Sequence, residues 1–413
     1  MKKIYMVIIL IITSLNIYSQ ETHPYIHPTP GEIVIMASTP IPHGLPPTHE
    51  AYKDLIECGF NLGIEGGDIE CYKQQFAAIG NLNFKYLISN PDLRTDKRIK
   101  YIEAFKDSKY LGGWCLRDEP SYSEFDSLKK QYDALYRADP DNLIYMNFLG
   151  GIIKGVTGPF THYMDYLNYI GELFKPEMWS YDFYPFQIKN NKIEVDYDQF
   201  YQDLECMWKV AKIYQRPFWT YLQSMAYKSS MFYRPVTNET YLRFVVFSSL
   251  AYGAQGVGYW TYGQRKSHDS ETYISALVNL NGKKTSAWYA AKKVNGEIKK
   301  FNDIFYNCEV KEVRHTGDRI YKGTRKLSGE FGPFKMIRSQ EAGVMASLIE
   351  NNGSQYVVIV NRDVFKNQKI TLELKPNRNV VDLSSKKERE YNWRKDINIT
   401  LEKGGYVIFN CNS

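Results

Sequence analysis

Short apolar and β-branched runs recur through the first three quarters of the chain, and segments with helical spacing of apolar residues separate them. Runs of this length and composition predict strands, whereas the 3.6-residue period predicts amphipathic helices. The eight predicted strands are residues 33–37, 60–64, 84–88, 111–116, 143–148, 178–181, 218–222 and 257–262. The clearest helical patterns are residues 122–136, 197–214, 239–252 and 286–302. Eight strands alternating with helices predict a (β/α)8 barrel over residues 21–304.

An open, doubly wound parallel sheet is the rival architecture. Such sheets carry a glycine-rich phosphate loop after the first strand, and no G-x-G-x-x-G follows residues 33–37. The barrel is therefore the favoured interpretation.

After about residue 305 short strands continue, but the helical patterns stop. Residues 344–349 and 356–361 flank Asn351-Asn352-Gly353, a turn sequence that predicts a hairpin. Further strands are predicted at residues 369–374, 379–383, 397–401 and 406–410. This pattern predicts an antiparallel β-sandwich over residues 305–413, which we expect to pack on the barrel and stabilise it.

The first 20 residues have the pattern of a secretory signal peptide. Lys2 and Lys3 precede the apolar run 4–15, which is short for a membrane span, and residues 16–20 are polar. No cysteine lies beside the expected cleavage site, which argues against a lipid anchor. We therefore expect a secreted or periplasmic protein with no membrane span after the signal is removed.

Composition narrows the function classes further. The net charge of +6 is small for 413 residues and the lysines are dispersed, which argues against nucleic-acid binding. Six scattered cysteines and isolated histidines match no metal-site pattern, so no metal or cofactor is expected. Aromatic residues make up 15% of the chain, including 34 tyrosines; beyond the core, such rings can stack on sugars.

The candidate chemistry lies where the predicted strands end, because the carboxyl ends of barrel strands meet at one mouth. The fourth strand ends in Arg117, Asp118 and Glu119, and Pro120 then stops the hydrogen-bond ladder. Paired carboxylates flanked by aromatic rings suit glycoside hydrolysis, which needs an acid for the leaving oxygen and a second carboxylate. We assign Glu119 as the general acid and Asp182 as its partner, and we expect Trp114 and Trp260 to raise the pKa of Glu119.

The remaining strand-end residues are candidates for binding a carbohydrate substrate. They are Glu65, Arg117, Asp118, Asn147, Tyr184, Gln223, Trp260 and Tyr262. Plainer roles remain open for several candidates: Asp182 as a turn residue, Glu65 as a loop charge, Asn147 as a strand end and Trp260 as barrel core.

Asp118-Glu119-Pro120 resembles the Asn-Glu-Pro that ends strand four in the clan A glycoside hydrolases, the large superfamily of sugar-cleaving (β/α)8 barrels. Residues 235–262 are similar to the seventh helix and eighth strand of its β-galactosidase-like members. The resemblance implies a glycoside hydrolase in which Glu119 is the acid/base. It also implies a glutamate nucleophile at the end of strand seven, where this chain has Gln223.

An amide cannot form a glycosyl-enzyme intermediate, so Gln223 leaves three explanations open. Asp182 supplies the second carboxylate, or the substrate's own acetamido group attacks, as in N-acetylhexosaminidase-type hydrolases, or the barrel binds glycans without cleaving them. Residues 178–182 loosely resemble the strand-six Tyr-Asp of the chitinase group, which uses the acetamido route. A lyase acting on uronic sugars is a weaker alternative, in which Arg117 would bind the carboxylate of the sugar.

Overall fold

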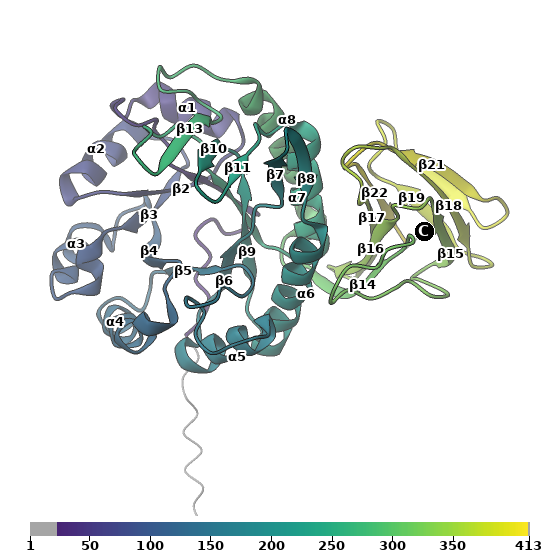
Figure 1. The fold of residues 1–413 in the computed structure, drawn as a ribbon, viewed down its shortest axis with the longest axis horizontal. Coiled ribbons are helices and arrows are strands. Elements are labelled where there is room, and N and C mark those ends of the chain that lie inside the picture. The colour runs from purple at the N-terminus through teal and green to yellow at the C-terminus, as the bar shows by residue number, and fades with distance from the viewer. Residues whose placement is uncertain (1–22, 412–413) are drawn as a thin grey trace, which may run out of the picture.

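The computed structural model describes residues 23–411, so the predicted signal peptide lies outside the described residues. Eight parallel strands close into a barrel in the order β1-β12-β9-β6-β5-β4-β3-β2 (Figure 1). The barrel strands are β1 (Val34–Ser38), β2 (Leu62–Gly66), β3 (Lys85–Ser89), β4 (Leu111–Asp118), β5 (Ile144–Leu149), β6 (Trp179–Asp182), β9 (Phe218–Gln223) and β12 (Gly256–Trp260). The predicted (β/α)8 fold is confirmed.

Helices surround the barrel and connect successive strands (Figure 1). They are α1 (His49–Glu57), α2 (Ile69–Ile79), α3 (Arg98–Phe105), α4 (Phe125–Ala138), α5 (Tyr163–Phe174), α6 (Tyr197–Tyr214), α7 (Glu239–Ala251), α8 (Ser286–Lys300) and the short α9 (Asn302–Phe305). Two 3-10 turns, η1 (Pro91–Arg94) and η2 (Tyr122–Glu124), precede α3 and α4. Several helices begin at a side chain that accepts a backbone N–H, such as Thr48, Asp68 and Asn238.

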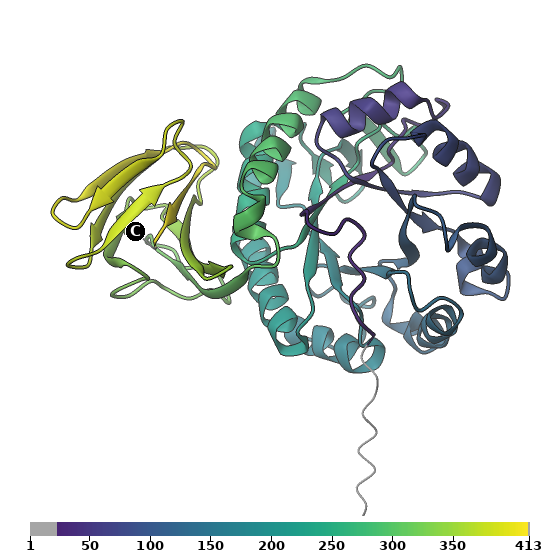
Figure 2. The same ribbon diagram turned by 180° about the vertical axis from the view of Figure 1, so that it is seen from behind.

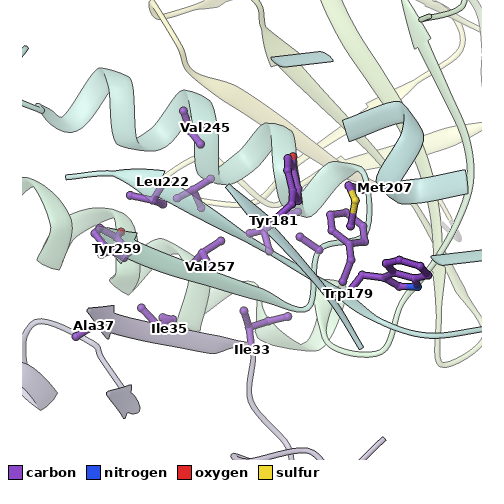
Figure 3. Close-up of a cluster of buried hydrophobic side chains, with 14 of the residues drawn as sticks. Ile33, Ile35, Ala37, Trp179, Tyr181, Met207, Leu222, Val245, Val257 and Tyr259 are labelled. Atoms are coloured by element: carbon purple, nitrogen blue, oxygen red, sulfur yellow. The ribbon is translucent and has the colours of Figure 1, made fainter. Parts of the chain in front are cut away.

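The alternation of side chains along each strand separates two apolar clusters. One set points into the barrel and includes Met36, Tyr145 and Trp219. The other set points outward and packs under the helices, as Ile35, Val257 and Tyr259 do (Figure 3). A strand residue's place in the alternation therefore decides whether it faces the barrel interior or the helix layer.

Short strands that were not predicted lie among the loops at the carboxyl ends of the barrel strands. They are β7 (Phe186–Lys189), β8 (Lys192–Val195), β10 (Ala226–Ser229), β11 (Tyr233–Arg234) and β13 (Glu271–Ser275). β7 and β8 form a hairpin, and the other three form a sheet in the order β11-β10-β13.

The opposite end of the barrel is covered by the segment that leads into β1. Tyr25 and Ile26 pack against the interior cluster, and the segment crosses the barrel in Figure 2. Tyr25 lies against Trp219 in this cluster, and the Ile26 N–H donates to the Glu177 carboxyl. This end is therefore closed, and the strand carboxyl ends form the mouth that is available for chemistry.

The C-terminal unit consists of two antiparallel sheets, as the sequence predicts. The larger has the order β14-β16-β17-β22-β19-β20 and the smaller β15-β18-β21. Their strands are β14 (Glu309–His315), β15 (Phe334–Ser339), β16 (Val344–Asn351), β17 (Ser354–Asn361), β18 (Gln368–Leu374), β19 (Asn379–Asp382), β20 (Arg389–Asn392), β21 (Ile397–Leu401) and β22 (Tyr406–Asn410). The predicted hairpin joins β16 to β17, and Asn352 and Gly353 both adopt positive φ in its turn.

The larger sheet is packed on both of its faces. Phe409 and Ala346 point between the two sheets, whereas Met345 and Val358 pack against the barrel helices. The Tyr406 ring stacks on Phe247 of α7 with 3.6 Å between ring centroids. Figure 1 shows the sandwich beside the α6–α8 side of the barrel.

Candidate active site

A β-bulge at the end of β4 sets the direction of the side chains in the Arg-Asp-Glu run. Cys115 points into the barrel, and the register with β5 shifts between Cys115 and Arg117. Asp118 therefore pairs with Asn147 and faces the mouth, while Arg117 is turned outward. The Arg117 guanidinium donates to both Glu124 carboxylate oxygens, at 3.1 and 3.2 Å, and to the Asp118 carbonyl. Arg117 is therefore held by Glu124, and its expected contact with substrate stays a prediction.

Glu119 turns the chain out of the strand in a left-handed conformation. Its φ is +45°, which a non-glycine residue rarely adopts, and its N–H donates to the Asn147 carbonyl at 2.8 Å. Pro120 follows and is buried. Strained backbone of this kind is concentrated at functional sites, and here it presents the Glu119 side chain at the mouth.

A chain of neutral polar groups orients two of the mouth carboxylates. The Tyr145 hydroxyl lies 2.7 Å from the Ser180 hydroxyl, which donates to the Asn147 Oδ1 at 2.7 Å. The Asn147 Nδ2 then donates to the Asp118 Oδ1 at 3.1 Å and to the Asp182 Oδ1 at 3.0 Å. Both of these oxygens therefore act as acceptors, so a proton on either carboxyl must sit on its other oxygen.

Glu119 and Asp182 are hydrogen-bonded to each other through their carboxyl groups. Two carboxylates can share such a bond only when one of them carries a proton. Burial raises the pKa of Glu119 and the neighbouring Asp118 charge raises it further, while the hydrogen bond with Asp182 offsets part of the rise. Burial and the Glu119 and Asp118 charges likewise raise the pKa of Asp182 well above its usual range. The pair therefore retains one proton at pH values where an isolated carboxyl is ionised.

Gln223 occupies the mouth end of β9. Trp219 and Tyr221 of the same strand point into the barrel, and alternation places Gln223 on that side, paired in register with Trp260. Its Nε2 donates to the Pro235 carbonyl at 2.9 Å, and its buried Oε1 has no partner among the described residues. The amide is thus held by the β11–α7 connection.

Trp260 and Tyr184 form an aromatic floor beside the carboxylates. Their rings are stacked, with 5.8 Å between centroids and 22° between planes, and Tyr227 packs edge-on against Trp260 at 5.0 Å. Trp260 and Tyr184 both keep part of their surface exposed. This arrangement offers a flat apolar face to a sugar ring next to the Glu119–Asp182 pair.

Three other residues expected at the mouth point away from it in the structure. Leu62 and Ile64 point into the barrel, so Glu65 faces the helix layer, where Thr39 hydrogen-bonds it and burial raises its pKa. β12 ends at Trp260, and Tyr262 is buried under α8, where its hydroxyl accepts from Trp288 Nε1 at 3.2 Å. Trp114 also faces outward, with its Nε1 donating to Asp139 at 2.8 Å, so it does not adjoin Glu119.

Several groups at the mouth were missed in the sequence. Ser180 lies inside the predicted sixth strand, where its hydroxyl could have been read as inward-facing from the alternation. Arg234 and Tyr273 come from the short strands β11 and β13, Arg265 comes from the connection between β12 and α8, and no local pattern marks them. Across residues 23–411, no group of His, Cys, Asp and Glu side chains has a metal-binding arrangement, and no helix there could span a membrane.

Comparisons with known proteins agree with this geometry. Residues 120–301 match the sequence model of a family described as beta-galactosidase, glycoside hydrolase family 42. These residues include α4 to α8 and the β5, β6, β9 and β12 strands of the barrel. No curated protein matches the chain. The matches support a glycoside hydrolase.

Solved structures show the same fold in other glycoside hydrolases. A catalytic mutant of Gan42B, a GH42 beta-galactosidase from G. stearothermophilus, superposes with a TM-score of 0.62 at 9% identity and covers 94% of this chain and 100% of its own. The beta-galactosidase of Bacillus circulans sp. alkalophilus gives 0.60 at 9% identity, covering 92% and 99%. That of Rahnella sp. R3 gives 0.60 at 8% identity, covering 94% and 100%. At these identities the likeness concerns the fold alone.

Proposed function

We propose that the protein is an exported glycoside hydrolase that cleaves a β-galactosidic bond in an oligo- or polysaccharide, with Glu119 as the general acid. The observation that carries the proposal is the hydrogen bond between the Glu119 and Asp182 carboxyls at the barrel mouth. A general acid must be protonated near neutral pH, and the shared bond holds a proton there. The choice of a galactoside follows the description of the matching family.

In this mechanism the proton lies between Glu119 and Asp182 until the leaving oxygen arrives. Glu119 donates it as the glycosidic bond breaks. The resulting negative charge is stabilised because Asn147 donates to Asp182 and orients its Oδ1. The Trp260 ring supports the sugar, and the apolar floor excludes water from the bond.

The contact between the two carboxyls limits what Asp182 can do. Hydrogen-bonded oxygens lie about 3 Å apart, whereas the two carboxylates of glycosidases are about 5–5.5 Å apart in retaining enzymes and 6.5–9.5 Å apart in inverting ones. Asp182 is therefore on the same side of the bond as Glu119. It acts as the partner that sets the protonation of Glu119, and the new bond to the anomeric carbon is formed by a water molecule, which adds OH to the sugar and leaves its other proton to a mouth carboxylate.

A second candidate activity follows from this geometry. Gln223 cannot be a nucleophile, and Asp182 is bonded to the acid, so a 2-acetamido group on the substrate is a suitable internal nucleophile. Asp182 or Asp118 would then accept the acetamido N–H and orient it. This favours hydrolysis of an N-acetylhexosaminide as the alternative to a galactoside.

Leaving-group dependence tests the role of Glu119. We expect Glu119→Gln to lower kcat/KM at least 10³-fold on phenyl glycosides, whose leaving oxygen needs a proton. The loss should be much smaller on 2,4-dinitrophenyl glycosides. Parallel series with β-galactosides and N-acetyl-β-hexosaminides separate the two candidate activities. Glu103→Gln, an exposed carboxyl on α3, is the control and should change neither series.

Two outcomes would contradict the proposal. A uniform loss across all leaving groups would remove Glu119 from the role of acid. Binding of oligosaccharides without any product in either series would instead indicate a non-catalytic glycan-binding barrel.

Export is tested separately. The charged start, apolar run and polar segment of residues 1–20 support a cleaved leader. We expect the full chain, expressed in a Gram-negative host, to be recovered from the periplasm or medium with an N-terminus near residue 21. Recovery of the intact chain from the cytosol would contradict export.

A further inference from the structure

Arg265 is an unpaired arginine beside the candidate active site. It lies in the segment that connects β12 to α8, five residues after Trp260. Its side chain is half-buried, and its buried Nε has no hydrogen-bond partner among residues 23–411. Within the same residues no carboxylate lies within ion-pair distance of its guanidinium. Leaving this buried Nε–H without an acceptor, away from bulk water, is costly.

Tyr273 of β13 holds this arginine next to the aromatic floor. The guanidinium carbon lies 5.6 Å from the centroid of the Tyr273 ring, a cation–π distance. The Tyr273 hydroxyl is hydrogen-bonded to Glu271 and lies 3.3 Å from His268, so the ring is anchored at its far end. On its other side the ring lies 6.2 Å from Trp260, edge to face. Arg265 is therefore separated from the floor by a single ring.

The charges around Arg265 divide the mouth into two sides. Asp118, Glu119 and Asp182 stand at the ends of β4 and β6. On the β1 and β12 side, Lys266 follows Arg265, and the pKa of His43 is lowered by burial and by both cations. Burial raises the pKa of Asp118 and of Glu65, and the positive charge of Arg265 offsets part of each rise, so the guanidinium lies close enough to act on both carboxyls. A bound substrate would thus meet an acidic side and a basic side.

A purely structural role explains this arrangement less well. Arginines that stabilise a fold usually donate to carbonyls or carboxylates, as Arg234 does to the Phe186 carbonyl at 3.0 Å and Arg117 does to Glu124. Arg265 makes neither kind of contact, although Tyr273 fixes its position. An arginine held in place but left without acceptors is suited to receive them from a ligand.

We propose that Arg265 binds an anionic substituent, a carboxylate or a sulfate ester, on the sugar next to the one that stacks on Trp260. The substrate class is therefore an acidic glycan. This inference rests on the proposed function, from which it takes the position of the bound glycan. What it adds is that the glycan carries a negative charge. The planar fork of the guanidinium matches two oxygens of either anion, and an anion there would supply the missing acceptors.

Binding without turnover tests the inference. Calorimetric titration of the Glu119→Gln protein would compare three probes of equal length: a neutral galacto-oligosaccharide, an oligogalacturonide and a sulfated galactan oligosaccharide. We expect at least one anionic probe to bind tenfold or more tightly than the neutral one, with the advantage shrinking at high salt. The preferred probe distinguishes a carboxylate ligand from a sulfate ligand.

Arg265→Gln in the same background should remove that advantage and leave the affinity for the neutral probe within threefold. Lys100→Gln, which removes an exposed charge on α3 outside the mouth, is the matched control and should retain the preference. Equal affinity for all three probes, or an equal loss for neutral and anionic probes in Arg265→Gln, would overturn the inference. Because these titrations need no hydrolysis, they remain informative even if Glu119→Gln shows that Glu119 is not the acid.

Discussion

Replacing Glu177 with glutamine should remove a large part of the pH dependence of stability. Glu177 lies just before β6 at the closed end of the barrel and is only 1% exposed. The Ile144 N–H donates to its Oε1 at 3.2 Å and the Ile26 N–H also donates to the carboxyl, but Oε2 has no partner among the described residues. Burial, the largest cause, raises its pKa from 4.5 to about 8, and the nearby Arg216 charge offsets only part of this.

The direction and size of this pH dependence follow from the linkage between proton binding and folding. The unfolded chain loses this proton near pH 4.5, whereas the folded protein keeps it to about pH 8. The contribution of Glu177 to stability is therefore complete below pH 4.5 and declines until about pH 8. A difference of 3.5 pH units, at about 1.36 kcal/mol each, gives a total loss of roughly 5 kcal/mol. At pH 7 the loss is roughly 3.4 kcal/mol by the same conversion.

Denaturant unfolding at pH 5, 7 and 8.5 provides the assay. Glutamine keeps the carbonyl that accepts from Ile144 and cannot ionise, so Glu177→Gln should gain several kcal/mol relative to the wild type as the pH rises. Glu103→Gln, which changes an exposed carboxyl, should follow the wild type throughout. Parallel curves for the wild type and Glu177→Gln would refute the reasoning, because they would mean that Glu177 ionises normally in the folded protein.

Four further predictions concern the site and its supports. In Asn147→Ala, Asp118 and Asp182 lose the donor that lowers the pKa of each, so the basic limb of the kcat/KM profile, which reports loss of the shared proton, should move to higher pH. Arg117→Gln should keep kcat and KM within about threefold and cost about 0.5–1 kcal/mol in unfolding, as a partly exposed ion pair to Glu124 would. Tyr262→Phe should lose about 1 kcal/mol with unchanged KM, measured by thermal unfolding and steady-state kinetics, because its hydroxyl contacts Trp288 and not the mouth. Gly113→Ala should destabilise the fold by about 2–4 kcal/mol in the same unfolding assay, since φ is +143° and a Cβ would lie 2.5 Å from the Leu143 carbonyl oxygen.

The alternation of apolar residues was sufficient to predict the barrel. Runs such as 33–37 and 218–222 are apolar on both faces because one face fills the barrel and the other meets helices. The same reasoning placed Asp118, Glu119 and Asp182 at strand ends, since the carboxyl ends of parallel strands share one mouth. The sequence alone therefore predicted the architecture and the position of the acidic residues.

Side-chain direction was harder to predict than position. The bulge after Cys115 turns Arg117 outward and Asp118 toward the mouth, and no feature of the local sequence predicts this bulge. Tyr262 was counted as a strand end because the apolar run continues past Trp260, where the strand stops. The direction of Trp114 could have been predicted, because the next residue, Cys115, points into the barrel and neighbouring strand residues point to opposite sides. The direct bond between Glu119 and Asp182 depends on three-dimensional spacing and could not be inferred from sequence.

The sandwich and the barrel share one continuous apolar cluster. Val313, Met345 and Val358 of the C-terminal unit belong to the same buried cluster as the side chains under α6 and α7. The Ser347 hydroxyl also donates to the Ala251 carbonyl at 2.6 Å, at the end of α7. The fold thus changes from barrel to sandwich near residue 305, but the hydrophobic core continues across the junction. Separating the two units there would expose a large apolar surface to water on each fragment. The protein should therefore be expressed and engineered as a single unit.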